Sequence, residues 1–218
     1  MPVPKAIRLR REAWGFGAGS ICFLLGALPF YQEAVGVVAT DVTFFIGALL
    51  FTAGAFIQLA LSGRKPPRSG ASRPDLFDWW ATAVQFAGTL FFNLSTTQAL
   101  TAALGSGTHT GWRPDAIGSI LFLVSSGLGL AATLERSALW DPEARAWRCT
   151  WFNMFGSVFF GISAIGAYVV PTTNDPASLF WANLGTALGA VCFLAAALLS
   201  RPGRAAVRAA RQRPVPGV

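Results

Sequence analysis

Charged and reactive side chains are what this sequence has least of. Only 12% of its 218 residues are charged and 53% are hydrophobic, whereas about a quarter of an average soluble chain is charged. This balance argues against a soluble globular domain and predicts a membrane protein. The three cysteines and one histidine are too few and too scattered to predict a disulfide scaffold or a Cys/His metal cluster.

Charged residues are also absent from the middle of every long apolar run. This absence argues against proton-coupled pumps, voltage sensors and carboxylate relays. The sequence has no nucleophile elbow and no phosphate-binding glycine loop, and we interpret His109 as a solvated surface residue. We therefore predict a protein that is not an enzyme, with no catalytic residues, no bound metal and no cofactor.

The sequence does contain six apolar runs, each close to the ~20 residues that cross the hydrocarbon core of a bilayer. They are residues 14–31, 42–62, 79–104, 115–134, 151–170 and 179–200. We expect an all-α fold, a polytopic transmembrane bundle of six helices. Residues 1–13 and 201–218 are expected to be a basic N-terminus and a basic tail.

The basic residues lie almost entirely on one side of these runs. All of the 17 except Arg113 precede the first run, follow the last, or lie between the second and third or the fourth and fifth. By the positive-inside rule both termini are predicted to be cytoplasmic, and the alternation supports six spans. The net charge of +7 is interpreted as this topology signal together with attraction to anionic lipid, rather than as nucleic-acid binding.

One nine-residue pattern occurs in every apolar run: Gly, small, aliphatic, any, Phe, any, aliphatic, small, small. On a helix the glycine, the phenylalanine and the later small residue share one face, and small residues let helices approach closely in a bilayer. The copies recur in pairs about 70 residues apart, which predicts three tandem helical hairpins over residues 14–62, 79–134 and 151–200. The predicted packing residues are Gly19, Phe23, Gly47, Phe51, Gly88, Phe92, Gly118, Phe122, Gly156, Phe160, Gly189 and Phe193.

Two of these glycines belong to G-x-x-x-G pairs, Gly15 with Gly19 and Gly185 with Gly189. Such pairs favour close helix contacts. The pattern leaves two outcomes open: the pairs close the bundle between its first and last helices, or they join two copies of the chain.

Uncharged polar residues also lie within the runs, and they have two interpretations. They line a path for a small polar solute, or they hydrogen-bond between helices, which we favour. The residues are Gln85, Thr89, Asn93 and Thr97, spaced four apart, with Asn153, Asn183 and Thr186. Four carboxylates at or shortly before helix starts are interpreted as helix caps: Asp41, Asp78, Asp115 and Asp175. The alternative is an outward-facing cation site, on the side opposite the basic residues, formed by Glu33, Asp41, Asp115 and Asp175.

Several segments are distinctive: Val-Thr-Phe-Phe-Ile-Gly at 42–47, Asp-Trp-Trp at 78–80, the run from 84 to 93 that ends Phe-Phe-Asn, Trp-Arg-Pro-Asp at 112–115, and the segments 183–186 and 189–194. Together they resemble the YrhK-like bacterial membrane proteins. The similarity covers most of residues 14–200. It implies a bacterial membrane location and helical repeats, and it carries over no catalytic residues.

For function, the first expectation is a structural or interaction module of the bacterial cytoplasmic membrane. Its partners would be the lipid bilayer, anionic lipid at the cytoplasmic face, and a second copy of the chain or another membrane protein. The alternative is a channel or transporter for a small uncharged or polar solute. The two differ in whether the polar stripe from Gln85 to Thr97 meets water. A membrane enzyme is disfavoured because no acids, bases or metal ligands cluster at one interface.

Overall fold

A computed structural model describes residues 5–63, 66–67, 70–106, 112–136, 145–173 and 175–202, and within these ranges the fold is all-helical. Its helices are α1 (Lys5–Gly26), α2 (Pro29–Val35), α3 (Val37–Ser62), α4 (Arg73–Ala103), α5 (Trp112–Arg136), α6 (Arg145–Gly166) and α7 (Leu179–Ser200). The only β-type pairing in the described residues is a single bridge between Val169 and Pro176.

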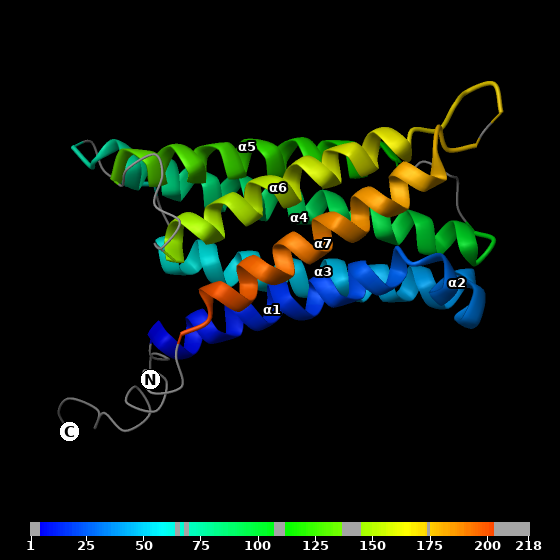
Figure 1. Ribbon diagram of the computed structural model, residues 1–218, viewed down its shortest axis with the longest axis horizontal. Helices are drawn as coiled ribbons and strands as arrows, with labels where there is room; N and C mark the ends of the chain where they lie inside the picture. Colours follow the sequence, from blue (N-terminus) through cyan, green and yellow to red (C-terminus); the bar gives the residue numbers. More distant parts are fainter. Residues whose placement is uncertain are drawn as a thin grey trace.

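The six long helices lie side by side and form one bundle (Figure 1). Each packs on the next along the chain, and α7 returns to pack on α1, so the contacts close a ring. The contacts are most extensive within three pairs: α1 with α3, α4 with α5, and α6 with α7. We call the end at which α1, α4 and α6 begin the basic end, and the opposite end, where α2 lies, the far end.

Four helices, α3, α5, α6 and α7, are long and apolar enough to cross a membrane, and α1 with α2 counts as a fifth if the bent pair is one span. The chain is therefore a helical membrane protein. The expected six spans are not all confirmed, because α4 is not among these helices. Its 31 residues reach about 46 Å at 1.5 Å per residue, but Gln85, Asn93, Gln98 and several threonines lower its hydropathy.

The first apolar run, residues 14–31, does not form one continuous helix. Helix α1 ends at Gly26, and α2 begins at Pro29 after a bend of 81°. Proline lacks the backbone N–H that a continuous helix needs and disfavours helical geometry in the residue before it. Leu28 is accordingly extended, with φ −88° and ψ 119°. The bend turns α2 across the far end of the bundle (Figure 1).

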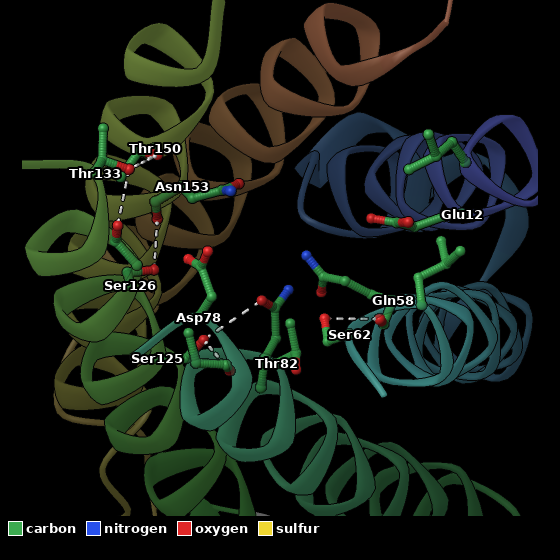
Figure 2. Close-up of a pocket in the computed structure, with 15 residues that line it drawn as sticks. Glu12, Gln58, Ser62, Asp78, Thr82, Ser125, Ser126, Thr133, Thr150 and Asn153 are labelled. Carbon is green, nitrogen blue, oxygen red and sulfur yellow. Dashed lines mark hydrogen bonds between the residues drawn. The ribbon is translucent and has the colours of Figure 1, made fainter. Parts of the chain in front are cut away.

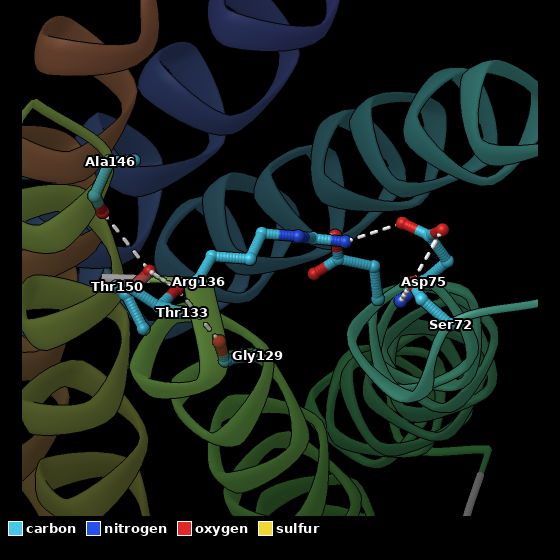
Figure 3. Close-up of polar contacts among 8 residues, drawn as sticks. Ser72, Asp75, Gly129, Thr133, Arg136, Ala146 and Thr150 are labelled. Carbon is cyan, nitrogen blue, oxygen red and sulfur yellow. Dashed lines mark hydrogen bonds and ion pairs between the residues drawn. The ribbon is translucent and has the colours of Figure 1, made fainter. Parts of the chain in front are cut away.

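Helix α4 begins at Arg73, six residues before the apolar run that predicted it. Ser72 caps this helix, accepting the backbone N–H of Asp75 at 3.3 Å while its hydroxyl donates to the Asp75 carboxylate at 2.7 Å. Arg136, at the end of α5, forms ion pairs with Asp75 and Asp78 (Figure 3). The Ser72 hydrogen bond, with help from Arg136, holds the pKa of Asp75 below its usual value. These contacts join α4 to α5 at the basic end.

The centre of the bundle is a cluster of six phenylalanines, one from each long helix, which we call the phenylalanine core: Phe23, Phe51, Phe92, Phe122, Phe160 and Phe193. Each is at most 7% exposed. The rings from α1, α4 and α6 lie 5.9–6.4 Å from one another, and those from α3, α5 and α7 lie 5.6–6.3 Å apart. Within the three closest helix pairs the ring centroids are only 5.0–5.4 Å apart.

The pattern glycines make room for these rings. A Cβ on Gly88 would stand 2.7 Å from Phe122, and one on Gly118 would stand 3.1 Å from Phe92. The phenylalanine of each of the helices α4 and α5 therefore packs against the glycine of the other. The same reciprocal contacts join α1 with α3 and α6 with α7: Gly19 with Phe51, Gly47 with Phe23, Gly156 with Phe193, and Gly189 with Phe160.

The two G-x-x-x-G motifs lie at the contacts between α1 and α3 and between α6 and α7. Gly15 meets the backbone of Gly54 in α3, and Gly185 meets the backbone of Ser163 in α6. Neither pair lies between α1 and α7, where Gly17 instead lies near Ala197. The close approach that these glycines permit is therefore satisfied within one copy of the chain.

Candidate functional site

A polar cavity of about 360 Å³ opens at the basic end of the bundle (Figure 2). Its walls come from five helices, and its largest polar side chains are Glu12 of α1, Gln58 of α3, Asp78 and Gln85 of α4, and Asn153 of α6. Figure 2 shows Glu12 and Gln58 on one side, pointing across the space towards Asp78 and Asn153. We call this space the basic-end cavity.

The basic-end cavity stops at the phenylalanine core. A smaller space of about 50 Å³ shares four of its lining residues, Glu12, Gln58, Gln85 and Asn153, and is also lined by Phe16 and Phe193. The polar wall therefore reaches inward until it meets the aromatic rings.

A second cavity, of about 350 Å³, lies at the far end. Its polar lining includes Asp41 of α3, Ser95 and Gln98 of α4, and Asp115 of α5. Two of the four carboxylates that the sequence marked for this side are therefore brought together, whereas Glu33 and Asp175 do not line it. We call this space the far-end cavity.

The phenylalanine core lies between the two cavities. Along α3 the order is Asp41, Phe51, Gln58, which runs from the far-end cavity through the core to the basic-end cavity. The same order holds on the two neighbouring helices: Gln98, Phe92 and Gln85 on α4, and Asp115, Phe122 and Ser125 on α5. Each of these helices thus carries one buried ring between two polar surfaces.

The polar stripe on α4 does not form one continuous lining. Gln85 lines the basic-end cavity and accepts a hydrogen bond from Ser125 at 3.4 Å. Thr89 is 0% exposed and donates to the carbonyl of Phe86 in its own helix. Thr97 is exposed and donates to the carbonyl of Asn93. Only the first member of the stripe faces either described cavity.

Besides Gln85, two of the predicted polar residues make hydrogen bonds between helices. Asn93 donates from its amide to the hydroxyl of Thr52 in α3 at 2.9 Å. Thr186 of α7 shares a 2.7 Å hydrogen bond with Ser163 of α6. Asn153 instead lines the basic-end cavity, and Asn183 is a partly buried residue of α7 that lines neither cavity.

The sequence patterns missed several residues of the basic-end cavity. Glu12 lies inside helix α1, although its position placed it in the expected basic terminus. Gln58 lies eleven residues after Gly47, which is about three helical turns along the same face. This spacing could have predicted that Gln58 faces the inside of the bundle. Ser125 and Ser126 end the fourth copy of the repeat, where the pattern asks only for small residues.

The described residues offer no metal centre: no three of their His, Cys, Asp or Glu side chains are grouped to hold an ion. Cys22, Cys149 and Cys192 form no disulfide bond among the described residues. His109 lies outside the described residues. The basic-end cavity is therefore a space bounded by carboxylates, amides and hydroxyls.

No family model, curated protein or solved structure matches the chain, so the resemblance to YrhK-like proteins stays a prediction.

Proposed function

We propose that this protein is a channel or transporter for a small polar solute. The observation that carries the proposal is the pair of cavities at opposite ends of the bundle, separated by the phenylalanine core. The basic-end cavity is mainly polar, whereas the far-end cavity is mainly apolar and includes two carboxyl groups. A hydrophobic constriction between two wet vestibules is a known way to close a membrane pathway. In this arrangement the core is the closed barrier.

Six spans in three tandem hairpins are part of the proposal. The most extensive helix contacts support it, since they join α1 with α3, α4 with α5, and α6 with α7. In these same pairs the phenylalanine of each helix packs against the glycine of the other. Helix α4 would cross the membrane although it is more polar, because α3 and α5 flank it. By the positive-inside rule the basic residues favour cytoplasmic termini, and in this proposal the protein lies in a bacterial cytoplasmic membrane with the basic-end cavity facing inward.

The enclosed oxygens favour this function over a purely structural bundle. Gln58 Oε1 at the basic-end cavity and Gln98 Oε1 at the far-end cavity are buried without a hydrogen-bond partner. A buried polar group left unpaired costs about 1–3 kcal/mol. Water or solute in the adjoining cavities would supply partners for these two oxygens.

Flux into proteoliposomes tests the proposal. The full chain is reconstituted, and uptake of methylammonium, urea, glycerol and acetate is followed for the wild type, Phe160→Ala and Phe155→Ala. Phe160 is 5% exposed in the core, and Phe155 on the same helix is 49% exposed, so the second variant is a matched control. Phe160→Leu is added as a milder change that keeps most of the packing.

We expect both substitutions at Phe160 to raise the flux of at least one solute, and Phe155→Ala to leave it unchanged. Equal flux in all variants and in empty liposomes would contradict transport. The structural or interaction module would then be the better account.

A further inference from the structure

Each hydroxyl group of the basic-end cavity has a main-chain carbonyl within hydrogen-bond distance. The six pairs are Ser62 to Gln58, Thr82 to Trp79, Ser125 to Ala81, Ser126 to Asn153, Thr133 to Gly129, and Thr150 to Ala146. Ser126 also shares a 2.8 Å hydrogen bond with Ser157, and Thr133 shares one of 3.1 Å with Thr150. A hydroxyl has one proton and two lone pairs. A hydroxyl whose proton is held by one of these partners presents only lone pairs to the cavity.

The carboxylate and an amide oxygen add further acceptors. Glu12 makes no hydrogen bond or ion pair within the described chain, and Gln58 Oε1 is buried without a partner. Figure 2 shows these two side chains next to each other on one wall. Asp78 on the facing wall is already paired with Arg136, so Glu12 is the carboxyl group of the cavity without an ion-pair partner among the described residues.

Donors are scarce on the same wall. No Lys, Arg or His side chain lines the cavity in the described part of the chain, which leaves the amide NH₂ groups of Gln58, Gln85 and Asn153 as the side-chain N–H donors. Arg10, Arg11 and Arg148 are exposed near this end. Their charge is screened over about 8 Å at physiological salt and is neutralised in part by anionic lipid.

We propose that the basic-end cavity binds a small ammonium-type cation, with the Glu12 carboxylate matching its charge and the hydroxyl and amide oxygens accepting its N–H groups. This inference rests on the proposed function and names the class of its solute. A cavity of about 360 Å³ holds a methylammonium ion together with several waters, each of which takes ~30 Å³ in the liquid. An anion would meet the Glu12 charge and a wall of acceptors.

Isothermal titration of the purified full chain tests this inference. The probes are methylammonium chloride, potassium chloride, urea and sodium acetate, titrated into the wild type, Glu12→Gln, Glu12→Asp and Glu33→Gln. Glu33 is an exposed carboxylate of α2 at the other end of the bundle, so its substitution removes the same charge elsewhere. Size-exclusion elution and thermal melting establish that each variant is folded.

We expect methylammonium to bind more tightly than potassium and urea, and acetate not to bind. Glu12→Gln should weaken methylammonium binding about tenfold to a hundredfold, the usual worth of a hydrogen bond to a charged group. Glu12→Asp should retain part of the affinity, and Glu33→Gln should retain all of it.

Three results would overturn the inference: acetate binding, urea or potassium binding as tight as that of methylammonium, or methylammonium binding that is unchanged in Glu12→Gln. None of these removes the proposed function, which fails if no solute flux is found or if the cavity admits no water. Cysteine labelling of the cavity wall, described in the Discussion, separates the two failures.

Discussion

Gly185 of α7 lies directly against Ser163 of α6: a Cβ on Gly185 would stand 2.6 Å from the Ser163 nitrogen. The contact is backbone against backbone, so no side chain can rotate away to make room. The same approach lets the Ser163 hydroxyl donate to the carbonyl of Ala182 in α7 at 2.7 Å. Close packing and an interhelical hydrogen bond therefore depend on one missing methyl group.

Gly185→Ala should destabilise the bundle by ~1–3 kcal/mol, the usual cost of overpacking a tight core. Gly127→Ala is the matched control, because Gly127 is also helical but a Cβ there meets nothing within 4 Å. It should be neutral or stabilising by up to about 1 kcal/mol, since alanine favours helix over glycine. Unfolding by SDS or heat measures both, and a Gly185→Ala variant as stable as Gly127→Ala would contradict the packing account.

Leucine at Gly88 or Gly156 should prevent assembly of the bundle. A Cβ at these positions already stands 2.7 Å from Phe122 and 2.8 Å from Phe193, respectively, so a longer side chain displaces a core ring. Cys22→Ala keeps the Cβ and removes only a partly buried thiol, and it should fold normally. The measurement is the yield of monodisperse protein after size exclusion; equal yields of all three variants would show that these glycines are not packing residues.

The hydrogen bond from Asn93 to Thr52 should contribute a small coupling energy. Polar contacts between membrane helices average ~0.6 kcal/mol and reach at most about 2 kcal/mol. A double-mutant cycle of Asn93→Leu and Thr52→Val, read by SDS unfolding, measures the coupling directly. A coupling of zero would mean that Asn93 finds another partner or water, against the geometry of the 2.9 Å contact.

The contact between Asp75 and its neighbours predicts a pH dependence. Its pKa is lowered from 3.8 by the Ser72 hydroxyl and by Arg136, so its contribution to stability is fully present above the unfolded value and is lost as the pH falls through the lower folded value. Because the carboxylate is exposed, the contribution is small. The melting temperature of Asp75→Asn should therefore lie slightly below that of the wild type at pH 6 and meet it below pH 3.8. A constant difference across this range would contradict the assignment.

The sequence predicted the helical membrane class because glycine and phenylalanine recur at helical spacing inside apolar runs. The bend between α1 and α2 was missed because residues 14–31 are apolar throughout, and hydropathy does not register that Pro29 breaks the helix. Glu12 was missed for the opposite reason, since its charged neighbours made it part of a terminus. That Gln85 faces Ser125 depends on how α4 and α5 are rotated against each other, and no spacing within one helix encodes that rotation.

The most direct test of the account is labelling by a membrane-impermeant maleimide in a version that lacks Cys22, Cys149 and Cys192. Single cysteines are placed at Gln85 and Asn153, which line the basic-end cavity, and at Ala48 and Ala190, which are 0% exposed and follow the pattern glycines Gly47 and Gly189. We predict labelling at the first two positions from the basic side and protection at the last two. Protection at all four positions would mean a dry bundle and contradict the central claim that the basic-end cavity is open to solute.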